Sequence, residues 1–125
     1  LLIGFYEVKV FCILGVPRIV QISRKDSRSP TGRTTDFFSR DFIHLPVTSL
    51  RTPNSTDALR PPRLLKDILC LSEELSRRFN FIRVDFYTND KTIKVGELTS
   101  CDRAGRGRYR ERNAEKVLSD CLFRS

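Results

Sequence analysis

The stretch that decides the fold is residues 81–99, which read FIRVDFYTNDKTIKVGELT. On either side of the polar residues 89–91, β-branched and aromatic residues alternate with charged ones, as is typical of strands that bury one face. Asn and Asp between two such runs are typical of a hairpin loop. The stretch therefore predicts two antiparallel strands over residues 81–87 and 92–99.

The register of these two strands decides which charged side chains meet. Side chains alternate between the faces of a strand, so Arg83 and Asp85 share one face. With a three-residue loop, Thr88 pairs with Thr92 and Arg83 pairs with Glu97. Asp85 and Glu97 then become diagonal neighbours on that face, roughly 6–8 Å apart at Cβ. A loop that differs by one residue would place Glu97 on the opposite face from Asp85.

Two carboxylates at that spacing can share a hard cation. Magnesium takes a few carboxylate oxygens and completes its shell with water and substrate phosphates. An arginine beside it can contact a phosphoryl oxygen as charge develops during transfer. Asp85 and Glu97 are therefore candidate metal ligands, and Arg83 is a candidate catalytic residue. The same spacing also fits a plain cross-strand ion pair between Arg83 and Glu97, with Asp85 as its third member.

The first half of the chain predicts further strand structure. Residues 7–23 have the pattern of a hairpin, with alternating apolar residues on either side of a turn at residues 15–17. Residues 24–33 are polar and basic and contain Pro30 and Gly32, so a loop is expected there. The aromatic residues of residues 35–47 are expected to pack on a core.

Two helices are expected in the second half. Pro61 and Pro62 suit the first turn of a helix that ends near Asn80, and a second, short helix is expected over residues 113–122. Together with the strands, this order favours an α+β domain with a largely antiparallel sheet flanked by helices. The residues of the first helix that recur at a helical period and are expected to face the core are Leu64, Leu65, Ile68, Leu69, Leu71 and Leu75.

Composition narrows the functional classes. The 125 residues suit one domain, and the net charge of +8 favours anionic partners such as nucleotides, nucleic acids, acidic glycans or membrane surfaces. No apolar run approaches the ~20 residues of a membrane helix. The four cysteines form no Cys-x-x-Cys pair and His44 is the only histidine, which argues against a zinc site. The cysteines are expected to be thiols in a reduced cytoplasm, with a disulfide between distant cysteines as the alternative.

Several stretches together resemble one known family. Residues 83–87 (RVDFY) and 96–99 (GELT), whose two acids are twelve positions apart, look like the paired metal-binding strands of the TupA-like ATP-grasp proteins of teichuronopeptide biosynthesis. Residues 7–20 resemble that family's strand pair after the nucleotide hinge. Residues 35–46 resemble its aromatic Asp-x-Asp-Trp-like segment, and residues 63–79 its Leu-rich helix. The resemblance covers residues 7–122.

The resemblance implies an ATP-grasp fold and ATP-dependent ligation, in which a carboxylate is activated as an acyl phosphate and an amine then forms an amide. Asp85 and Glu97 would hold Mg²⁺ at the ATP phosphates, and Thr99 stands where many ATP-grasp enzymes place a metal-binding Asn. Arg83 would contact phosphate or the acyl phosphate, and Lys9 the nucleotide. The implied cofactors are ATP and Mg²⁺. The implied substrate is a carboxylate-bearing small molecule or glycan, used in the cytoplasmic assembly of a cell-surface polysaccharide.

Beside Lys9, the arginines of the first basic loop are candidates for contacts with phosphate or an acidic substrate: Arg24, Arg28 and Arg33. ATP-grasp enzymes hold the nucleotide between two lobes, and residues 1–125 resemble only the carboxyl-terminal lobe. The chain is therefore expected to be a single partial domain without its amino-terminal nucleotide lobe.

Two alternatives stay open at this point. Residues 103–110 (RAGRGRYR) mix glycine, arginine and an aromatic as binders of single-stranded nucleic acid do. The stretch is short and contains no recognised motif, so no specific nucleic-acid partner is expected from it. The other alternative is a degenerate lobe of the same fold that has no catalytic role.

Overall fold

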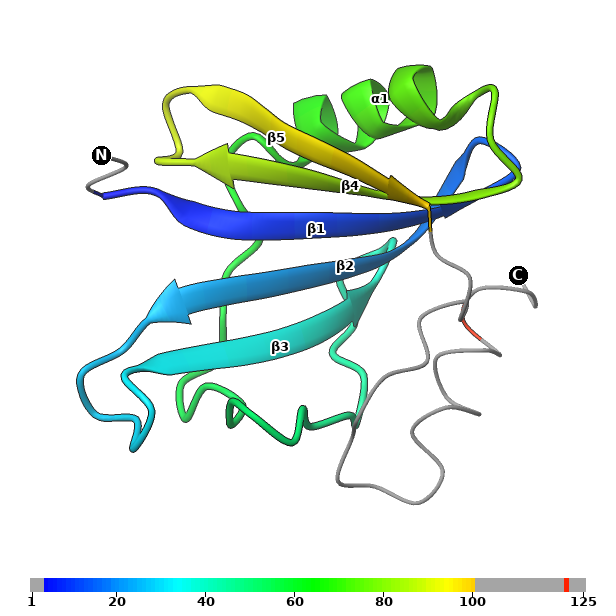
Figure 1. Cartoon of the computed structure of the whole chain (residues 1–125). Coiled ribbons are helices and arrows are strands. Elements are labelled where there is room, and N and C mark those ends of the chain that lie inside the picture. Colours follow the sequence, from blue (N-terminus) through cyan, green and yellow to red (C-terminus); the bar gives the residue numbers. More distant parts are fainter. Residues whose placement is uncertain (1–3, 101–120, 122–125) are drawn as a thin grey trace.

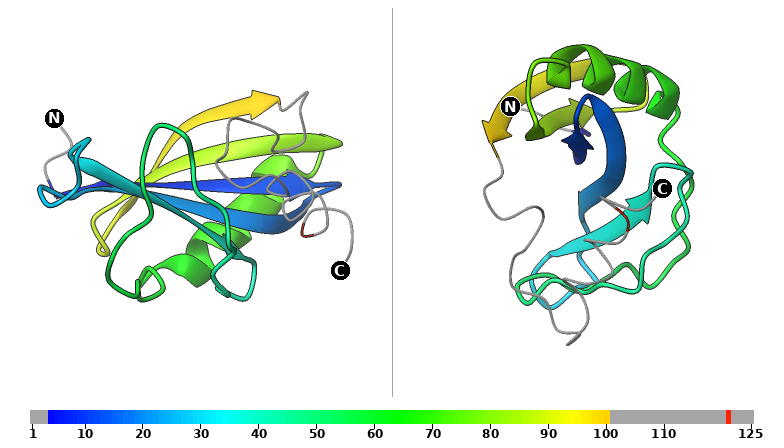
Figure 2. Two further views of the ribbon diagram at one scale, coloured as in Figure 1. Left: turned by 90° about the horizontal axis from the view of Figure 1, so that it is seen from below. Right: turned by 90° about the vertical axis from the view of Figure 1, so that its right-hand side faces the viewer.

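The computed structural model describes residues 4–100 and residue 121. These residues form five strands and one helix: β1 (Tyr6–Ile13), β2 (Val16–Lys25), β3 (Arg33–Ser39), α1 (Leu65–Ser76), β4 (Phe81–Thr88) and β5 (Ile93–Ser100). The strands make one antiparallel sheet in the order β3-β2-β1-β4-β5, and α1 lies along one face of it (Figures 1 and 2). The predicted α+β architecture with an antiparallel sheet is confirmed.

The first hairpin is present, with a tighter turn than the sequence predicts. The turn consists of Leu14 and Gly15, whose φ angles are 50° and 79°. Two consecutive positive φ values are typical of the two-residue turn that matches the twist of antiparallel strands, and Gly15 accepts one without a steric cost. Pro17 lies within β2, opposite Cys12 and next to an irregularity in the β1–β2 register.

The strand β3 was not predicted from the sequence. It pairs with β2 and buries both Phe37 and Phe38, which point to opposite faces because they are adjacent in a strand. Phe42 stacks on Phe38 with ring centroids 3.9 Å apart. The expectation that these aromatic residues pack on a core is therefore correct, although the strand that places two of them was missed.

The helix α1 covers the sheet through a narrow stripe. Ile68, Ser72 and Ser76 are its fully buried residues, and the Ser72 hydroxyl donates to the Ile68 carbonyl oxygen at 2.7 Å. Leu71 is exposed, contrary to the prediction, because it lies off this stripe. The sheet residues on the same side form the main core: Tyr6, Val8, Val10, Cys12, Val20, Ile22, Phe38, Ile82, Val84 and Phe86.

The opposite face of the sheet has an apolar part and a polar part. Phe11, Ile19, Phe37 and Val47 form a second, smaller cluster there. The Cys121 thiol reaches the same side and donates to the Arg18 carbonyl oxygen at 3.3 Å. The rest of this face is polar, and the candidate site lies in that part.

Two predictions fall outside the described residues, namely the helix over residues 113–122, of which only residue 121 is described, and the basic stretch 103–110. Within the described part, Cys12, Cys70 and Cys121 are free cysteines. Among these residues the structure contains no helix with the length and apolar character needed to cross a bilayer.

Burial of Cys12 gives a first testable result. Burial, the largest cause, raises the pKa of this thiol from 9.0 to about 11, which lowers its thiolate fraction near pH 8 about a hundredfold. Iodoacetamide at pH 8 should therefore label exposed Cys70 first and leave Cys12 unreacted until the chain is unfolded in urea. Peptide mass spectrometry follows both sites, and equal labelling in the folded protein would contradict this packing of β1.

Candidate functional site

The hairpin of β4 and β5 has a register different from the predicted one. Thr88 pairs with Ile93 rather than with Thr92, so the loop has four residues. The pairing then shifts again between Asp85 and Phe86, so that Asp85 lies directly opposite Glu97. The predicted diagonal relation between the two acids is therefore wrong. They are direct cross-strand partners, whose Cβ atoms are typically about 4.5–5.5 Å apart.

The second shift determines the face on which Glu97 lies. With a four-residue loop and regular pairing, Glu97 would oppose Val84 and point to the side that α1 covers. The extra residue at Gly96 forms a bulge, which reverses the alternation and returns Glu97 to the face of Asp85. A Cβ atom at Gly96 would lie 2.8 Å from Cε2 of the Tyr87 ring. The bulge is thus closely covered by an aromatic side chain, and glycine fits there.

Gly96→Ala should therefore disturb the site without unfolding the protein. The added methyl must push the Tyr87 ring aside, so we expect a loss of roughly 1–2 kcal/mol in the free energy of unfolding, as for other overpacked positions. Urea denaturation measures this loss. A Tyr87→Leu background should reduce the effect of the same substitution. A loss that is equal in both backgrounds would show that the ring is not the obstacle.

Arg83 connects the two acids. Its Nε donates to Asp85 Oδ1 at 2.7 Å and its Nη2 donates to Asp85 Oδ2 at 3.0 Å, a two-pronged pair. The same Nη2 lies 3.8 Å from Glu97 Oε1. The Asp85 side chain is only 7% exposed, whereas that of Glu97 is 65% exposed. One acid is therefore fixed in the sheet, and the other extends into solvent beside it.

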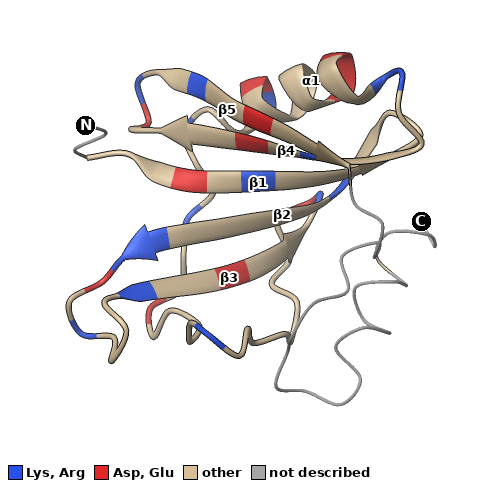
Figure 3. Ribbon diagram, in the orientation of Figure 1, with Lys and Arg blue, Asp and Glu red and all other residues tan. Residues whose placement is uncertain are grey.

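Lys9 and Thr99 complete this group on the same face. Lys9 on β1 pairs with Asp85 across the sheet, and Thr99 on β5 pairs with Arg83. The Arg83 Nη2 donates to the Thr99 hydroxyl at 3.5 Å. Figure 3 shows the acidic positions of β4 and β5 side by side, next to the charged positions of β1. The structure thus gathers on one surface five of the candidate residues: Lys9, Arg83, Asp85, Glu97 and Thr99.

Two residues on this face were not predicted from the sequence. Tyr87 pairs with Glu7 on β1, and Glu7 accepts a hydrogen bond from Arg33 Nη2 at 3.2 Å. The pKa of Tyr87 is raised, first by the charge of Glu7, with smaller contributions from Asp85 and Glu97. These three carboxylates therefore all act on the Tyr87 phenol, which places it beside the acid pair. Glu7 alternates with the apolar residues of β1, which is the sequence signal that could have placed it on the polar face. The pairing of β1 with β4, which brings Glu7 next to Tyr87, could not be read from that signal.

The donor set of this surface suits magnesium. Asp85 and Glu97 offer carboxylate oxygens and Thr99 offers a hydroxyl, which are hard ligands of the kind that Mg²⁺ prefers. Within residues 4–100 and 121 no group of three or more His, Cys, Asp or Glu side chains is arranged to hold a metal. Two carboxylates match an ion that takes the rest of its shell from water and phosphate. Arg83 occupies one lone pair on each oxygen of Asp85, so an ion bound at Asp85 would share this carboxylate with the Arg83 guanidinium.

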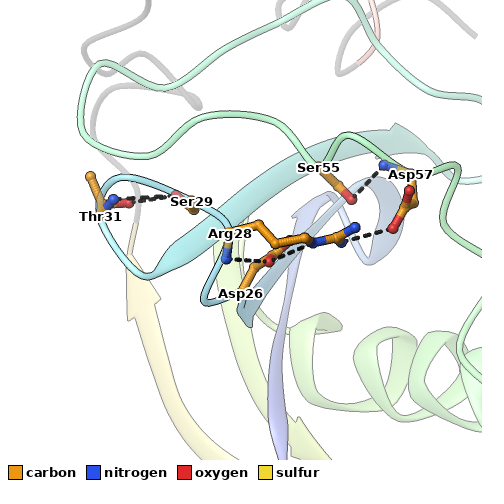
Figure 4. Close-up of polar contacts among 6 residues, drawn as sticks. All are labelled: Asp26, Arg28, Ser29, Thr31, Ser55 and Asp57. Atoms are coloured by element: carbon orange, nitrogen blue, oxygen red, sulfur yellow. Dashed lines mark hydrogen bonds and ion pairs between the residues drawn. The ribbon is translucent and has the colours of Figure 1, made fainter.

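Of the three candidate arginines Arg24, Arg28 and Arg33, only Arg33 lies on the face of this group. Arg33 reaches Glu7 on the site face. Arg28 pairs with Asp26 and Asp57 at the end of the β2–β3 hairpin (Figure 4). Arg24 stacks on the ring of Tyr6, which belongs to the helix-side core.

Comparison with known proteins adds one finding. A family model described as TupA-like ATPgrasp matches residues 3–123, which is nearly the whole chain. No curated protein and no solved structure matches the sequence significantly.

Proposed function

The chain belongs to the TupA-like ATP-grasp family, and from this membership we propose that the polar face of β1, β4 and β5 is the phosphate end of a magnesium–ATP site. An ATP-grasp protein has a general ligase-like role. We propose specifically that this protein is an ATP-dependent carboxylate–amine ligase.

One observation carries this proposal: Asp85 and Glu97 lie directly opposite each other on the face that α1 leaves open, with Arg83 between them. A plain surface ion pair needs only one acid for each base. Here two carboxylates share one arginine. Two carboxylates held this close together on an open face supply the oxygen ligands that a divalent ion takes.

In this proposal Asp85 and Glu97 hold the magnesium, and the Thr99 hydroxyl lies beside them. When bound, the ion would neutralise phosphate oxygens and hold them in line for attack. Lys9 lies on the neighbouring strand, opposite Asp85, from which an ammonium group can reach a phosphate as a point charge. Arg83 would turn its guanidinium from Asp85 toward the transferred phosphoryl group.

The proposed reaction proceeds in two steps. A carboxylate oxygen of the substrate attacks the terminal phosphorus of ATP, the bond to ADP breaks, and an acyl phosphate forms. An amine nitrogen then attacks the acyl carbon, loses a proton and displaces inorganic phosphate, which leaves an amide. The residues of this face position the phosphate and stabilise charge rather than forming covalent bonds.

We propose a uronic acid or an acidic amino acid as the carboxylate substrate, in the assembly of a cell-surface polysaccharide or its peptide decoration. The five-stranded sheet would be the carboxyl-terminal lobe of the site, and an amino-terminal lobe would hold the adenine. This substrate class and lobe arrangement are those that the family resemblance implies.

Oxygen transfer tests the reaction class. The protein is incubated with ATP, Mg²⁺, an amine mixture and either glutamate or glucuronate labelled with ¹⁸O in the carboxylate. Carboxylate activation through an acyl phosphate transfers one ¹⁸O atom to each released phosphate, which mass spectrometry detects. ATP turnover that releases phosphate without ¹⁸O from either acid would contradict activation of these substrates.

A further inference from the structure

A groove on the other side of the sheet is not used by this mechanism. Two cavities of about 350 Å³ each adjoin one another, because Ser55, Asp57 and Leu59 line both, and together they are called the groove. It runs between the end of the β2–β3 hairpin and the segment of residues 53–59. Asp36, which lines one of the cavities, pairs with Ile22 of the helix-side core. The groove is therefore on the same side of the sheet as α1, away from Glu97.

The segment that forms one wall is held in place by side-chain hydrogen bonds. The Asn54 amide donates to the carbonyl oxygens of Thr35 and Val47, at 3.0 and 3.1 Å. The backbone N–H of Ser55 donates to both oxygens of Asp36 at 3.2 Å. The groove is thus built by fixed contacts between this segment and β3.

One end of the groove carries the cation Arg24. Arg24 lies with its guanidinium 3.9 Å from the Tyr6 ring centroid. Its Nε atom is buried and has no hydrogen-bond partner among the described residues. A buried charged donor without an acceptor costs free energy comparable to a lost hydrogen bond or more. An anion bound at this end would pair with the positive charge of the guanidinium.

The acids of the groove already have partners. Asp36 is held by Ser55 and by His44, whose Nε2 lies 3.2 Å from Oδ1. Asp57 accepts from Arg28 Nη2 at 2.8 Å (Figure 4). The remaining acid, Asp26, also accepts from Arg28. Arg28 is shared by two carboxylates, whereas Arg24 and the exposed Lys25, which also line the groove, have no ion-pair partner in the described part of the chain. Of these two, Arg24 is the cation that lies over the Tyr6 ring.

The other end of the groove is aromatic. Phe38 and Phe42 stack with an interplanar angle of 7°, and His44 meets Phe38 edge-on with ring centroids 5.3 Å apart. Phe42 has a φ of 61°, an uncommon conformation for a bulky residue. This backbone conformation places the Phe42 ring in the groove wall, where a second ring could pack against it.

We propose that this groove binds a small molecule that carries an anionic group on a ring. The anion meets the Arg24 guanidinium, and the ring packs between Phe42 and Leu59. This site is separate from the proposed magnesium–ATP site and does not depend on it.

Phenyl phosphate is a suitable probe, because its two halves are available separately as inorganic phosphate and phenol. Titration followed by ¹H–¹⁵N NMR should shift the amides of residues 34 and 55–59. Each half alone should need at least a tenfold higher concentration, since a charge-assisted hydrogen bond or an aromatic contact contributes roughly 1–3 kcal/mol. Equal binding of inorganic phosphate, or shifts restricted to β4 and β5, would overturn the proposal.

Variants test the contributions of the two ends of the groove to binding separately. Arg24→Gln should weaken phenyl phosphate binding at least tenfold, and Arg40→Gln, which alters an exposed pair with Glu73, should leave it unchanged. Phe42→Leu should weaken phenyl phosphate while leaving the weak binding of inorganic phosphate unchanged. This variant keeps the test decisive if Arg24→Gln does not fold. Wild-type affinity in the folded Arg24→Gln or Phe42→Leu variant would overturn the assignment of that end.

Discussion

Asp85→Asn and Glu97→Gln should each lower magnesium-dependent ATP turnover by at least about a hundredfold, the usual cost of removing a charge-stabilising group from a phosphoryl-transfer site. Each change removes one negative charge from the pair that would hold the ion, and each keeps the side-chain volume. The measurement is the steady-state release of ADP as a function of Mg²⁺ concentration.

Glu97→Gln is the cleaner of the two variants. Glu97 is largely exposed and its contact with Arg83 is long, so its replacement should leave the free energy of unfolding almost unchanged. Glu74→Gln, at an equally exposed pair on α1, is the matched control and should retain full turnover. For Asp85→Asn the control is Asp36→Asn, which alters a buried acid on the other side of the sheet. Unaltered turnover in Glu97→Gln would remove the metal assignment.

Arg83→Gln should lower turnover far more than it lowers ATP affinity. We expect a fall of about a hundredfold in the turnover number and only a few-fold rise in the dissociation constant of ATP, because an arginine that meets developing charge acts mainly in the transition state. Gln can still donate to Asp85, which limits the cost of leaving that buried acid without its partner. Single-turnover kinetics and calorimetry give the two quantities separately.

The control for this variant is Arg77→Gln, which alters an exposed pair with Glu74 and should change neither quantity. Urea denaturation of Arg83→Gln is needed as well, since its partner Asp85 is buried. A folded Arg83→Gln protein with a pure defect in ATP binding would contradict the transition-state role.

Much of the fold was predictable, because apolar and polar residues alternate locally along most of its strands. The strands of both hairpins follow from the two-residue period of apolar positions. The strand β3 was not predicted, because Phe37 and Phe38 are adjacent and both buried. Such a strand lacks the alternation of apolar and polar residues that marks a strand with one solvent-exposed face. Leu71 fits a helical period, but α1 contacts the sheet through a stripe too narrow to include it.

The sequence predicted that Asp85 and Glu97 share a face, although it did not predict how the strands bring them there. That Asp85 and Glu97 share a face was inferred from a three-residue loop, whereas the structure reaches the same result through a four-residue loop and a bulge at Gly96. The longer loop and the bulge each shift the register by one residue. Because the total shift is two residues, Glu97 stays on the face of Asp85. Gly96 within a strand pattern is the signal that could have indicated the bulge. The adjacency of Lys9 to Asp85 depends on pairing between β1 and β4, a contact between distant segments that no local pattern specifies.

The most direct test of the acidic pair on β4 and β5 is paramagnetic broadening by Mn²⁺, a spectroscopic substitute for Mg²⁺. In the presence of ATP, sub-stoichiometric Mn²⁺ should broaden the amide signals of residues 83–87 and 95–99 first, and excess Mg²⁺ should restore them. Glu97→Gln should abolish this pattern. Broadening centred elsewhere, such as at Asp26 and Asp57, with β4 and β5 unaffected, would contradict the account.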